Sequence, residues 1–182
     1  MTILVAFADL TYTEKGISSN AFPYAGAVVS SYAKKKLKDE IEVELFKYPS
    51  DFKNYLESKE PNIVCFTNYT WTMEISYQFA KNIKIKYPKA VTIFGGPNYP
   101  NETHTQKSFL LSYPAIDFYV KGEGETAFLN LYENLEKYNF DPNILKSQKL
   151  NIGNCHYIHN EELFVGETLP RVEELDDIPS PY

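Results

Sequence analysis

The most informative stretch is Ala90-Val91-Thr92-Ile93-Phe94-Gly95-Gly96-Pro97, a short apolar run that ends at two glycines and a proline. Its length and its β-branched residues are typical of a strand buried on both faces of a parallel sheet. Two glycines at the end of such a strand give the backbone freedom and leave no Cβ in the way. We therefore expect this end of the strand to form one wall of a ligand crevice.

Four further apolar runs, separated by helical patterns, surround this stretch. We expect their strands at residues 3–8, 41–46, 62–67 and 117–120. Strands that alternate with helices predict an α/β fold with a doubly wound, five-stranded parallel sheet, flavodoxin- or Rossmann-like, in the strand order 2-1-3-4-5. Because the crossovers in such sheets are right-handed, all the carboxyl ends should meet at one edge.

The last quarter of the chain has a different character. Residues 141–170 contain two apolar runs around the turn at 160–162, which predicts a β-hairpin extension. Residues 171–182 are acidic and interrupted by prolines, as expected of a linker. We expect a Rossmann-like domain at 1–140, the hairpin at 141–170 and a linker at 171–182 that leads to a further domain.

Composition and charge exclude several classes of function. Eighteen basic and twenty-four acidic residues give a net charge of −6, so nucleic acid is not an expected partner. The first apolar run reaches Asp9 too early for a signal peptide, and no run approaches the roughly 18 apolar residues of a membrane span. We expect a cytoplasmic protein that does not bind membranes.

The loops also fail to match three familiar ligand classes. A receiver domain needs an acidic cluster after the first strand and an aspartate after the third, but Asp9 is alone and the third strand ends in Thr67-Asn68. The loop at 9–22 is too long for a flavodoxin-type phosphate loop, and no G-x-G-x-x-G follows the first strand. A small nucleotide-binding protein is therefore our weakest hypothesis.

Metal and nucleophilic chemistry are also not indicated. Cys65 and Cys155 are far apart in the sequence, which argues against a C-x-x-C redox or zinc site. His104, His156 and His159 form no defensible set with a serine or cysteine, so we interpret them as exposed or structural. No catalytic residue and no metal ligand is predicted.

The predicted site consists of the residues that follow four strands at the shared carboxyl edge. These are Asp9, Thr11, Thr67, Asn68, Tyr69, Thr70, Trp71, Gly95, Gly96, Pro97, Gly122, Glu123, Gly124 and Glu125. Purely structural interpretations compete with this one. The glycines could serve only tight turns and helix entries, and Trp71 could be a core residue because it begins an i+4 stripe with Ile75, Phe79 and Ile83.

The order of these features resembles one known family. Gly95-Gly96-Pro97 follows the fourth strand, Gly-Glu-Gly-Glu at 122–125 follows the fifth, and a hairpin beginning near Ile152 comes next. Arg171 and the closing run Leu-Asp-Asp-Ile-Pro-Ser-Pro-Tyr at 175–182 complete the order. Across essentially the whole chain, this order resembles the amino-terminal cobalamin (B12)-binding-like domain of B12-dependent radical SAM proteins.

The resemblance implies a cofactor and a partner. Cobalamin would occupy the crevice, with Gly95-Gly96 against its nucleotide tail and residues 67–71 beneath the corrin ring. In that family the closing run leads into a radical SAM barrel that holds S-adenosylmethionine and a 4Fe-4S cluster and acts on a small-molecule substrate. The C-x-x-x-C-x-x-C motif of that barrel is missing here, so we expect an excised or truncated domain that is not catalytic alone, from a methyltransferase or a ring-modifying enzyme.

One position departs from the family pattern. Many cobalamin-binding domains carry D-x-H-x-x-G after the first strand, with the histidine as lower cobalt ligand. Here Thr11 stands in place of that histidine and Glu14 in place of the glycine. Either cobalamin binds without a protein histidine, or the domain is a docking or substrate-recognition module that kept the fold and lost the cofactor.

Overall fold

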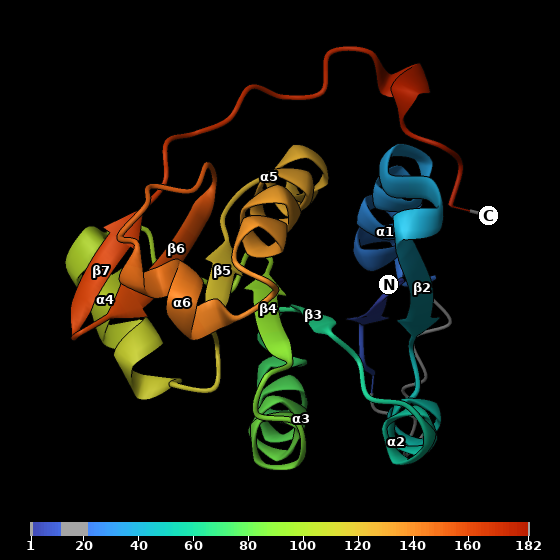
Figure 1. The fold of residues 1–182 in the computed structure, drawn as a ribbon, viewed down its shortest axis with the longest axis horizontal. Coiled ribbons are helices and arrows are strands. Elements are labelled where there is room, and N and C mark those ends of the chain that lie inside the picture. The colour runs from blue at the N-terminus through green and yellow to red at the C-terminus, as the bar shows by residue number, and fades with distance from the viewer. Residues whose placement is uncertain (1, 12–21, 182) are drawn as a thin grey trace.

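A seven-stranded mixed sheet runs through the molecule in the computed structural model, which describes residues 2–11 and 22–181 (Figure 1). The strands are β1 (Ile3–Ala8), β2 (Ile41–Phe46), β3 (Ile63–Thr67), β4 (Val91–Gly95), β5 (Phe118–Val120), β6 (Cys155–His159) and β7 (Glu162–Val165). Their order is β2-β1-β3-β4-β5-β6-β7, and the first five are parallel. The predicted fold class and the order 2-1-3-4-5 are confirmed.

The prediction of five strands is wrong, because the hairpin joins the sheet. β6 pairs antiparallel with β5, with Tyr119 opposite His156 and Val120 opposite Cys155, and β7 pairs antiparallel with β6. The two apolar runs around a short polar turn correctly predicted a hairpin but could not show where it lies. Without the hairpin, the edge of β5 would present unpaired N–H and C=O groups. β6 pairs with that edge and provides their hydrogen-bond partners.

Helices cover both faces of the sheet (Figure 1). One face is covered by α1 (Tyr24–Leu37) and α5 (Gly124–Lys137), and the other by α2 (Pro49–Ser58), α3 (Met73–Lys86) and α4 (Thr103–Ser112). The short α6 (Pro142–Ser147) precedes the hairpin, and two 3-10 turns lie at Lys38–Glu40 and Leu175–Asp177. None of the helices in the described ranges is long and apolar enough to cross a membrane.

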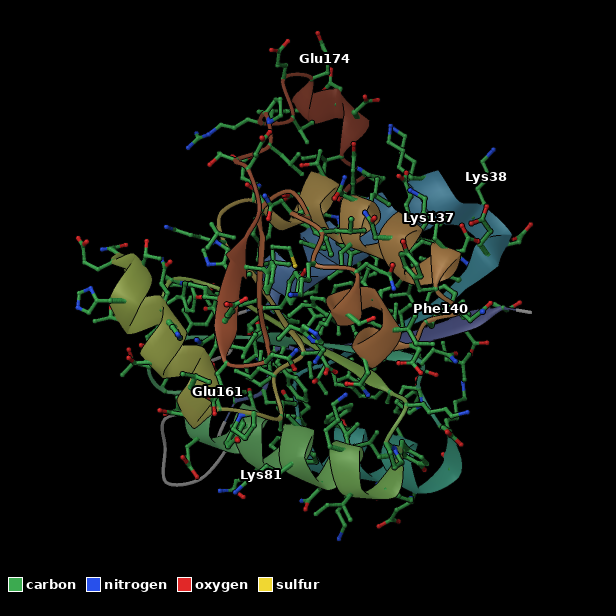
Figure 2. All side chains as sticks on the ribbon, turned by 60° about the vertical axis from the view of Figure 1, so that its left-hand side comes forward. Lys38, Lys81, Lys137, Phe140, Glu161 and Glu174 are labelled. Atoms are coloured by element: carbon green, nitrogen blue, oxygen red, sulfur yellow. The ribbon has the colours of Figure 1, made fainter. Side chains whose placement is uncertain are left out.

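Two cores result from the alternation of side chains along the strands. In β4, Val91 and Ile93 pack under α1 and α5, whereas Phe94 packs toward α3 and α4 on the opposite face. Figure 2 shows side chains filling both layers, while the labelled Lys38, Lys81 and Lys137 extend outward and are exposed.

A buried carboxylate lies next to the amino end of β5. Asp117 pairs with Lys84, and its Oδ1 lies 2.9 Å from Nζ of Lys146 on α6. Its Oδ2 also accepts a hydrogen bond of 3.0 Å from the backbone N–H of Thr92. Burial alone would raise the pKa of Asp117, but the charges of both lysines and these hydrogen bonds outweigh it and hold that pKa below its usual value.

The segment after β7 crosses over α5 and α1 on the outside of the molecule (Figure 1). Nε of Arg171 lies 3.4 Å from Oε1 of Glu123, and Nζ of Lys35 lies 3.3 Å from Oδ1 of Asp177. Ser31 donates a hydrogen bond of 3.2 Å to the Pro179 carbonyl. The segment predicted as a linker therefore contacts the domain at three places, and the domain boundaries stay a prediction.

Candidate functional site

An apolar cavity of about 150 Å³ lies at the carboxyl edge of the parallel strands, under α1 and α5. The strands contribute Phe7, Cys65, Ile93 and Val120 to its wall, and these residues share the sheet face that α1 and α5 cover. Six predicted residues line it: Thr67, Tyr69, Gly95, Gly96, Gly122 and Gly124. Further lining residues are Ala8, Phe66, Phe94, Ala25, Gly26, Val29 and Phe128.

Sequence reasoning missed the part of this wall that the strands and helices supply. Phe7, Cys65 and Ile93 were interpreted only as strand residues, although their two-residue alternation places them on the same sheet face as Gly95. Gly26 gave no signal beyond its small size. The Cβ of an alanine there would lie 3.3 Å from Leu45, so the residue lets α1 approach the sheet closely.

Gly95 and Gly96 differ in what surrounds them. Gly96 has φ +134°, and a Cβ on it would lie 2.6 Å from the carbonyl oxygen of Asn68. The fold itself therefore requires glycine there. A Cβ on Gly95 would meet only the Val120 carbonyl at 3.4 Å and the Val120 side chain at 3.7 Å. Since Gly95 follows Ile93 by two residues, its open side faces the cavity.

Asp9 and Thr67 lie side by side at the ends of β1 and β3. The Thr67 hydroxyl donates a hydrogen bond of 2.6 Å to Oδ1 of Asp9. Burial raises the pKa of Asp9, and the hydrogen bond from Thr67 and the charge of Lys47 oppose that shift only in part. The backbone N–H of Thr11 donates to the Lys47 carbonyl at 3.0 Å, which extends the pairing of β1 with the chain beyond β2.

The side chain of Asn68 makes its hydrogen bonds inside the protein rather than in the cavity. Its side chain is fully buried, and its Nδ2 donates to the Asn98 carbonyl at 2.6 Å and to the Tyr119 hydroxyl at 3.0 Å. Its Oδ1 accepts from Asn98 at 3.1 Å. These bonds tie the loop after β3 to the loop after β4, so Asn68 holds the rim of the cavity in place from inside the protein.

Tyr69 and Trp71 form an aromatic pair at the rim. Their rings stack with centroids 4.9 Å apart and an angle of 5° between the planes, and Trp71 is 68% exposed. The interpretation of Trp71 as a core residue is wrong, because α3 begins only at Met73 and the tryptophan precedes it. Thr70 is exposed, and the unpredicted Thr72 fixes the loop by accepting from the Tyr69 N–H and donating to the Thr67 carbonyl.

The loop after β5 brings glycines rather than carboxylates to the cavity. Gly122 has φ +90°, and a Cβ on Gly124 would lie 2.7 Å from Cγ2 of Val29, so Gly124 permits close packing of α5 on α1. Glu123 is exposed beside Arg171, and Glu125 lies in the first turn of α5, where a negative charge is favoured. Pro97, like Gly96, is exposed.

Among the residues that the structure describes, no histidine lines the cavity. His104 is exposed on α4, whereas His156 is buried, with its Nδ1 3.1 Å from the Tyr99 hydroxyl. Burial and the charge of Lys121 lower the pKa of His156 to about 4, so its imidazole is neutral at pH 7. In residues 2–11 and 22–181, no group of three or more His, Cys, Asp or Glu residues could hold a metal ion.

Comparison with known proteins gives consistent matches. The family model described as "B12 binding domain" matches residues 20–132, which is more than half of the chain. The cobalamin-dependent radical SAM methyltransferase TokK of Streptomyces tokunonensis is 28% identical over 123 residues, which are 68% of this chain and 17% of that protein. The uncharacterized methyltransferase PH0819 of Pyrococcus horikoshii is 29% identical over 132 residues, 72% of this chain and 26% of that one.

Solved structures show the same fold. The cobalamin-dependent S-adenosylmethionine radical enzyme OxsB, with aqua-cobalamin and S-adenosylmethionine bound, superposes with a TM-score of 0.69 at 16% identity. The match covers 99% of this chain and 24% of OxsB. The chain thus spans about a quarter or less of the length of these proteins.

Proposed function

Because the chain belongs to the B12 binding domain family, we propose that it binds cobalamin at the carboxyl edge of its sheet, as part of a larger radical SAM methyltransferase. The relatives named as cobalamin-dependent radical SAM proteins support this assignment. They are also much longer than this chain, which covers 17% of TokK and 24% of OxsB, so a further domain is expected. A radical SAM domain would then hold S-adenosylmethionine and the 4Fe-4S cluster and act on a small-molecule substrate. Alone, the domain described here would catalyse nothing.

The cavity fits one part of cobalamin. The nucleotide tail ends in a flat aromatic base, and an apolar protein cavity of about 150 Å³ is known to take up a benzene ring. The cavity here has the same volume, apolar walls, and an open side at Gly95 where a side chain would otherwise project. A corrin ring is far larger, so it would lie outside the cavity, over the rim that Tyr69 and Trp71 form. This open glycine in an apolar cavity is the observation that carries the proposal.

The residues of this chain would bind and orient the cofactor. The cavity would hold the tail away from water, the hydroxyl of Thr67 would offer a polar contact at the mouth, and the stacked Tyr69 and Trp71 would support one face of the ring. Bound cobalamin would supply a cobalt centre that can carry a methyl group. Since no histidine lines the cavity and Thr11 stands where one was expected, we propose that this domain provides no ligand to cobalt.

A cofactor-free docking or substrate-recognition module is the second candidate. Thr11 in place of the histidine favours it. This candidate would gain support from a crevice filled by Tyr69 or Trp71, yet Trp71 is 68% exposed and does not line the cavity, and Tyr69 borders the cavity without filling it. We therefore rank it second, and a small nucleotide-binding protein third.

The test is binding of hydroxocobalamin. Purified protein is mixed with the cofactor and passed over a gel-filtration column while the visible spectrum is recorded. We expect the corrin to elute with the protein. Elution of all the corrin at the small-molecule volume would favour the docking module instead.

The reactivity of the two cysteines can be used to test where the cofactor binds. Cys65 lines the cavity and is 9% exposed, whereas Cys155 is fully buried outside it. We expect hydroxocobalamin to slow the modification of Cys65 by a small uncharged thiol reagent, followed by mass spectrometry, and to leave Cys155 unchanged. Equal protection of both thiols, or of neither, would place the cofactor elsewhere.

A further inference from the structure

A second cavity, of about 390 Å³, lies beside the first at the same edge of the sheet. Its walls come from the start of α4, the loop after β5 and the start of the hairpin, and the segment around Arg171 closes one side. Gly122 borders both cavities. Unlike the first cavity, this one has mostly polar and charged side chains in its wall, beside Val165 and Leu169, and the proposed function uses none of the polar ones.

Two buried side chains in its wall have a nitrogen without a partner. Asn154 is 7% exposed, and its Oδ1 accepts from the Leu169 N–H at 3.0 Å. His156 is 3% exposed, and its Nδ1 contacts the Tyr99 hydroxyl at 3.1 Å. Nδ2 of Asn154 and Nε2 of His156 have no hydrogen-bond partner among the residues that the structure describes. In the described part of the chain neither nitrogen belongs to the buried side-chain atoms that lack a partner, so both reach solvent and can donate to a ligand in the cavity.

The His156 tautomer and the role of the Tyr99 hydroxyl depend on each other. In the described part of the chain, the Tyr99 hydroxyl has only Nδ1 of His156 as a hydrogen-bond partner; the roles depend on the tautomer, and we take the hydroxyl as the donor. The neutral imidazole then carries its proton on Nε2. Both free nitrogens in the wall are therefore N–H donors.

The electrostatics of the cavity favour an anion. Lys121 and Arg171 are at its rim, and Glu123 offsets one of these charges through its contact with Arg171. The ten-residue α4 begins at Thr103, in the cavity wall, without a side-chain N-cap, so its free N–H groups add positive potential there.

We propose that this cavity binds a small oxyanion, a carboxylate or a phosphate. Asn154 and His156 donate to its oxygens from the wall, and Lys121 supplies the opposite charge at the rim. The anion could be part of a separate small molecule, or it could be the phosphodiester of cobalamin, because Gly122 lines both cavities and places them next to each other. The site does not depend on the proposed function.

The test is a titration of the isotope-labelled protein with succinate and with inorganic phosphate, at constant ionic strength and followed by NMR. Uncharged succinamide is the matched probe. We expect saturable shifts of the Asn154 side-chain amide and the His156 ring for both anions and none for succinamide.

Three variants sharpen the result. Asn154→Asp keeps the oxygen that accepts from Leu169 but replaces the donor by a negative charge, and we expect it to abolish binding. Lys121→Gln changes an exposed side chain and leaves the fold intact, and we expect at least about tenfold weaker binding, as for the loss of a charged hydrogen bond. Lys107→Gln, on the exposed side of α4, is the control and should bind as the wild type does.

Equal affinity in Lys121→Gln and Lys107→Gln, or shifts that do not saturate, would overturn the proposal. A second titration with hydroxocobalamin identifies the source of the anion. Competition with succinate assigns the site to the phosphodiester of the cofactor, and simultaneous binding assigns it to a separate molecule. If the anions fail to bind while cobalamin still elutes with the protein, the proposed function stands without this site.

Discussion

Gly95 and Gly96 are adjacent in the sequence, but the structure gives them different reasons to lack a side chain. Gly96 has a positive φ and packs against the backbone of Asn68, so it serves the fold. Gly95 has nearly ordinary space around its missing Cβ and borders the cavity. The sequence shows only a pair of glycines, and the pair divides into a structural residue and a candidate binding residue.

Substitution by alanine should therefore affect cobalamin binding at Gly95 and the stability of the fold at Gly96. We expect Gly95→Ala to keep the free energy of unfolding within about 1 kcal/mol of wild type and to weaken cobalamin binding, because the added methyl group narrows the cavity. Gly96→Ala should lower stability by about 2 kcal/mol or more, because alanine is strained at that φ and meets the Asn68 carbonyl. Urea unfolding and a hydroxocobalamin titration measure both effects. Equal loss of stability in the two variants would contradict this division.

The charge of Asp117 should contribute to stability, because it pairs with Lys84 and Lys146. Asp117→Asn removes the partner of two partly buried lysines, and we expect a loss of about 3–5 kcal/mol at pH 7. The native pKa of Asp117 is lowered, so its contribution is complete above the unfolded pKa of about 3.9 and disappears as the pH falls through the lower native value. The difference between variant and wild type should therefore shrink as the pH is lowered from 7 to below 4.

Urea unfolding across this pH range checks the prediction, with Asp177→Asn as a matched control. The contact of Asp177 with Lys35 is exposed, so that variant should stay within about 1 kcal/mol of wild type. A difference for Asp117→Asn that stays constant down to pH 3 would contradict the lowered pKa.

At the scale of the elements, the contact between α1 and α5 sets the width of the cavity. Gly124 on α5 lies against Val29 on α1, and both border the cavity. Gly124→Ala would force its methyl group to within 2.7 Å of Cγ2 of Val29. We expect a loss of about 1–3 kcal/mol from this overpacking, reduced in part by the better helix propensity of alanine.

Removal of the opposing methyl groups should relieve the overpacking. We expect the double variant Gly124→Ala/Val29→Ala to be more stable than the sum of the single effects by about 0.5–3 kcal/mol. Val28→Ala changes the neighbouring buried valine, which supplies none of the three atoms nearest to a Cβ on Gly124, and should be additive with Gly124→Ala. Urea unfolding of the five variants measures the coupling, and additivity in both pairs would show that the helices are not in contact through Val29.

Elements that a local sequence pattern specifies could be predicted, whereas contacts between distant parts of the chain could not. Apolar runs and helical repeats correctly predicted the order of the five parallel strands, and glycines at strand ends marked the edge where the cavity lies. Trp71 was open to misinterpretation because an i+4 spacing continues past a helix end that only the Thr72 hydrogen bonds reveal. The pairing of β6 with β5 and the contacts of the segment after β7 depend on partners distant in sequence, for which a single chain gives no pattern.

At the scale of the whole molecule, the hairpin is part of the domain rather than an attachment. Leu145, Ile152, Cys155 and Tyr157 belong to the same buried core as β1 and α5, and the Tyr157 ring lies 5.6 Å from that of Phe118. The cavity wall includes Val120, whose strand has only three residues and depends on β6 for one of its two neighbours. The cofactor site should therefore require the hairpin, although no hairpin residue lines it.

A pair of truncations tests this dependence. The fragment 1–140 ends at the predicted domain boundary, and it would lose four buried core side chains at roughly 1.5–3 kcal/mol each, together with the partner of β5. That loss approaches the whole stability of a typical domain, about 5–15 kcal/mol. The fragment 1–170 keeps both the hairpin and the Leu169 contact with Asn154. We expect 1–170 to unfold cooperatively and to take up hydroxocobalamin, and 1–140 to aggregate through the open edge of β5 or to show no cooperative transition by circular dichroism. A cooperative 1–140 fragment with the melting temperature of 1–170 would show that the boundary at residue 140 is real and that the hairpin only covers the sheet.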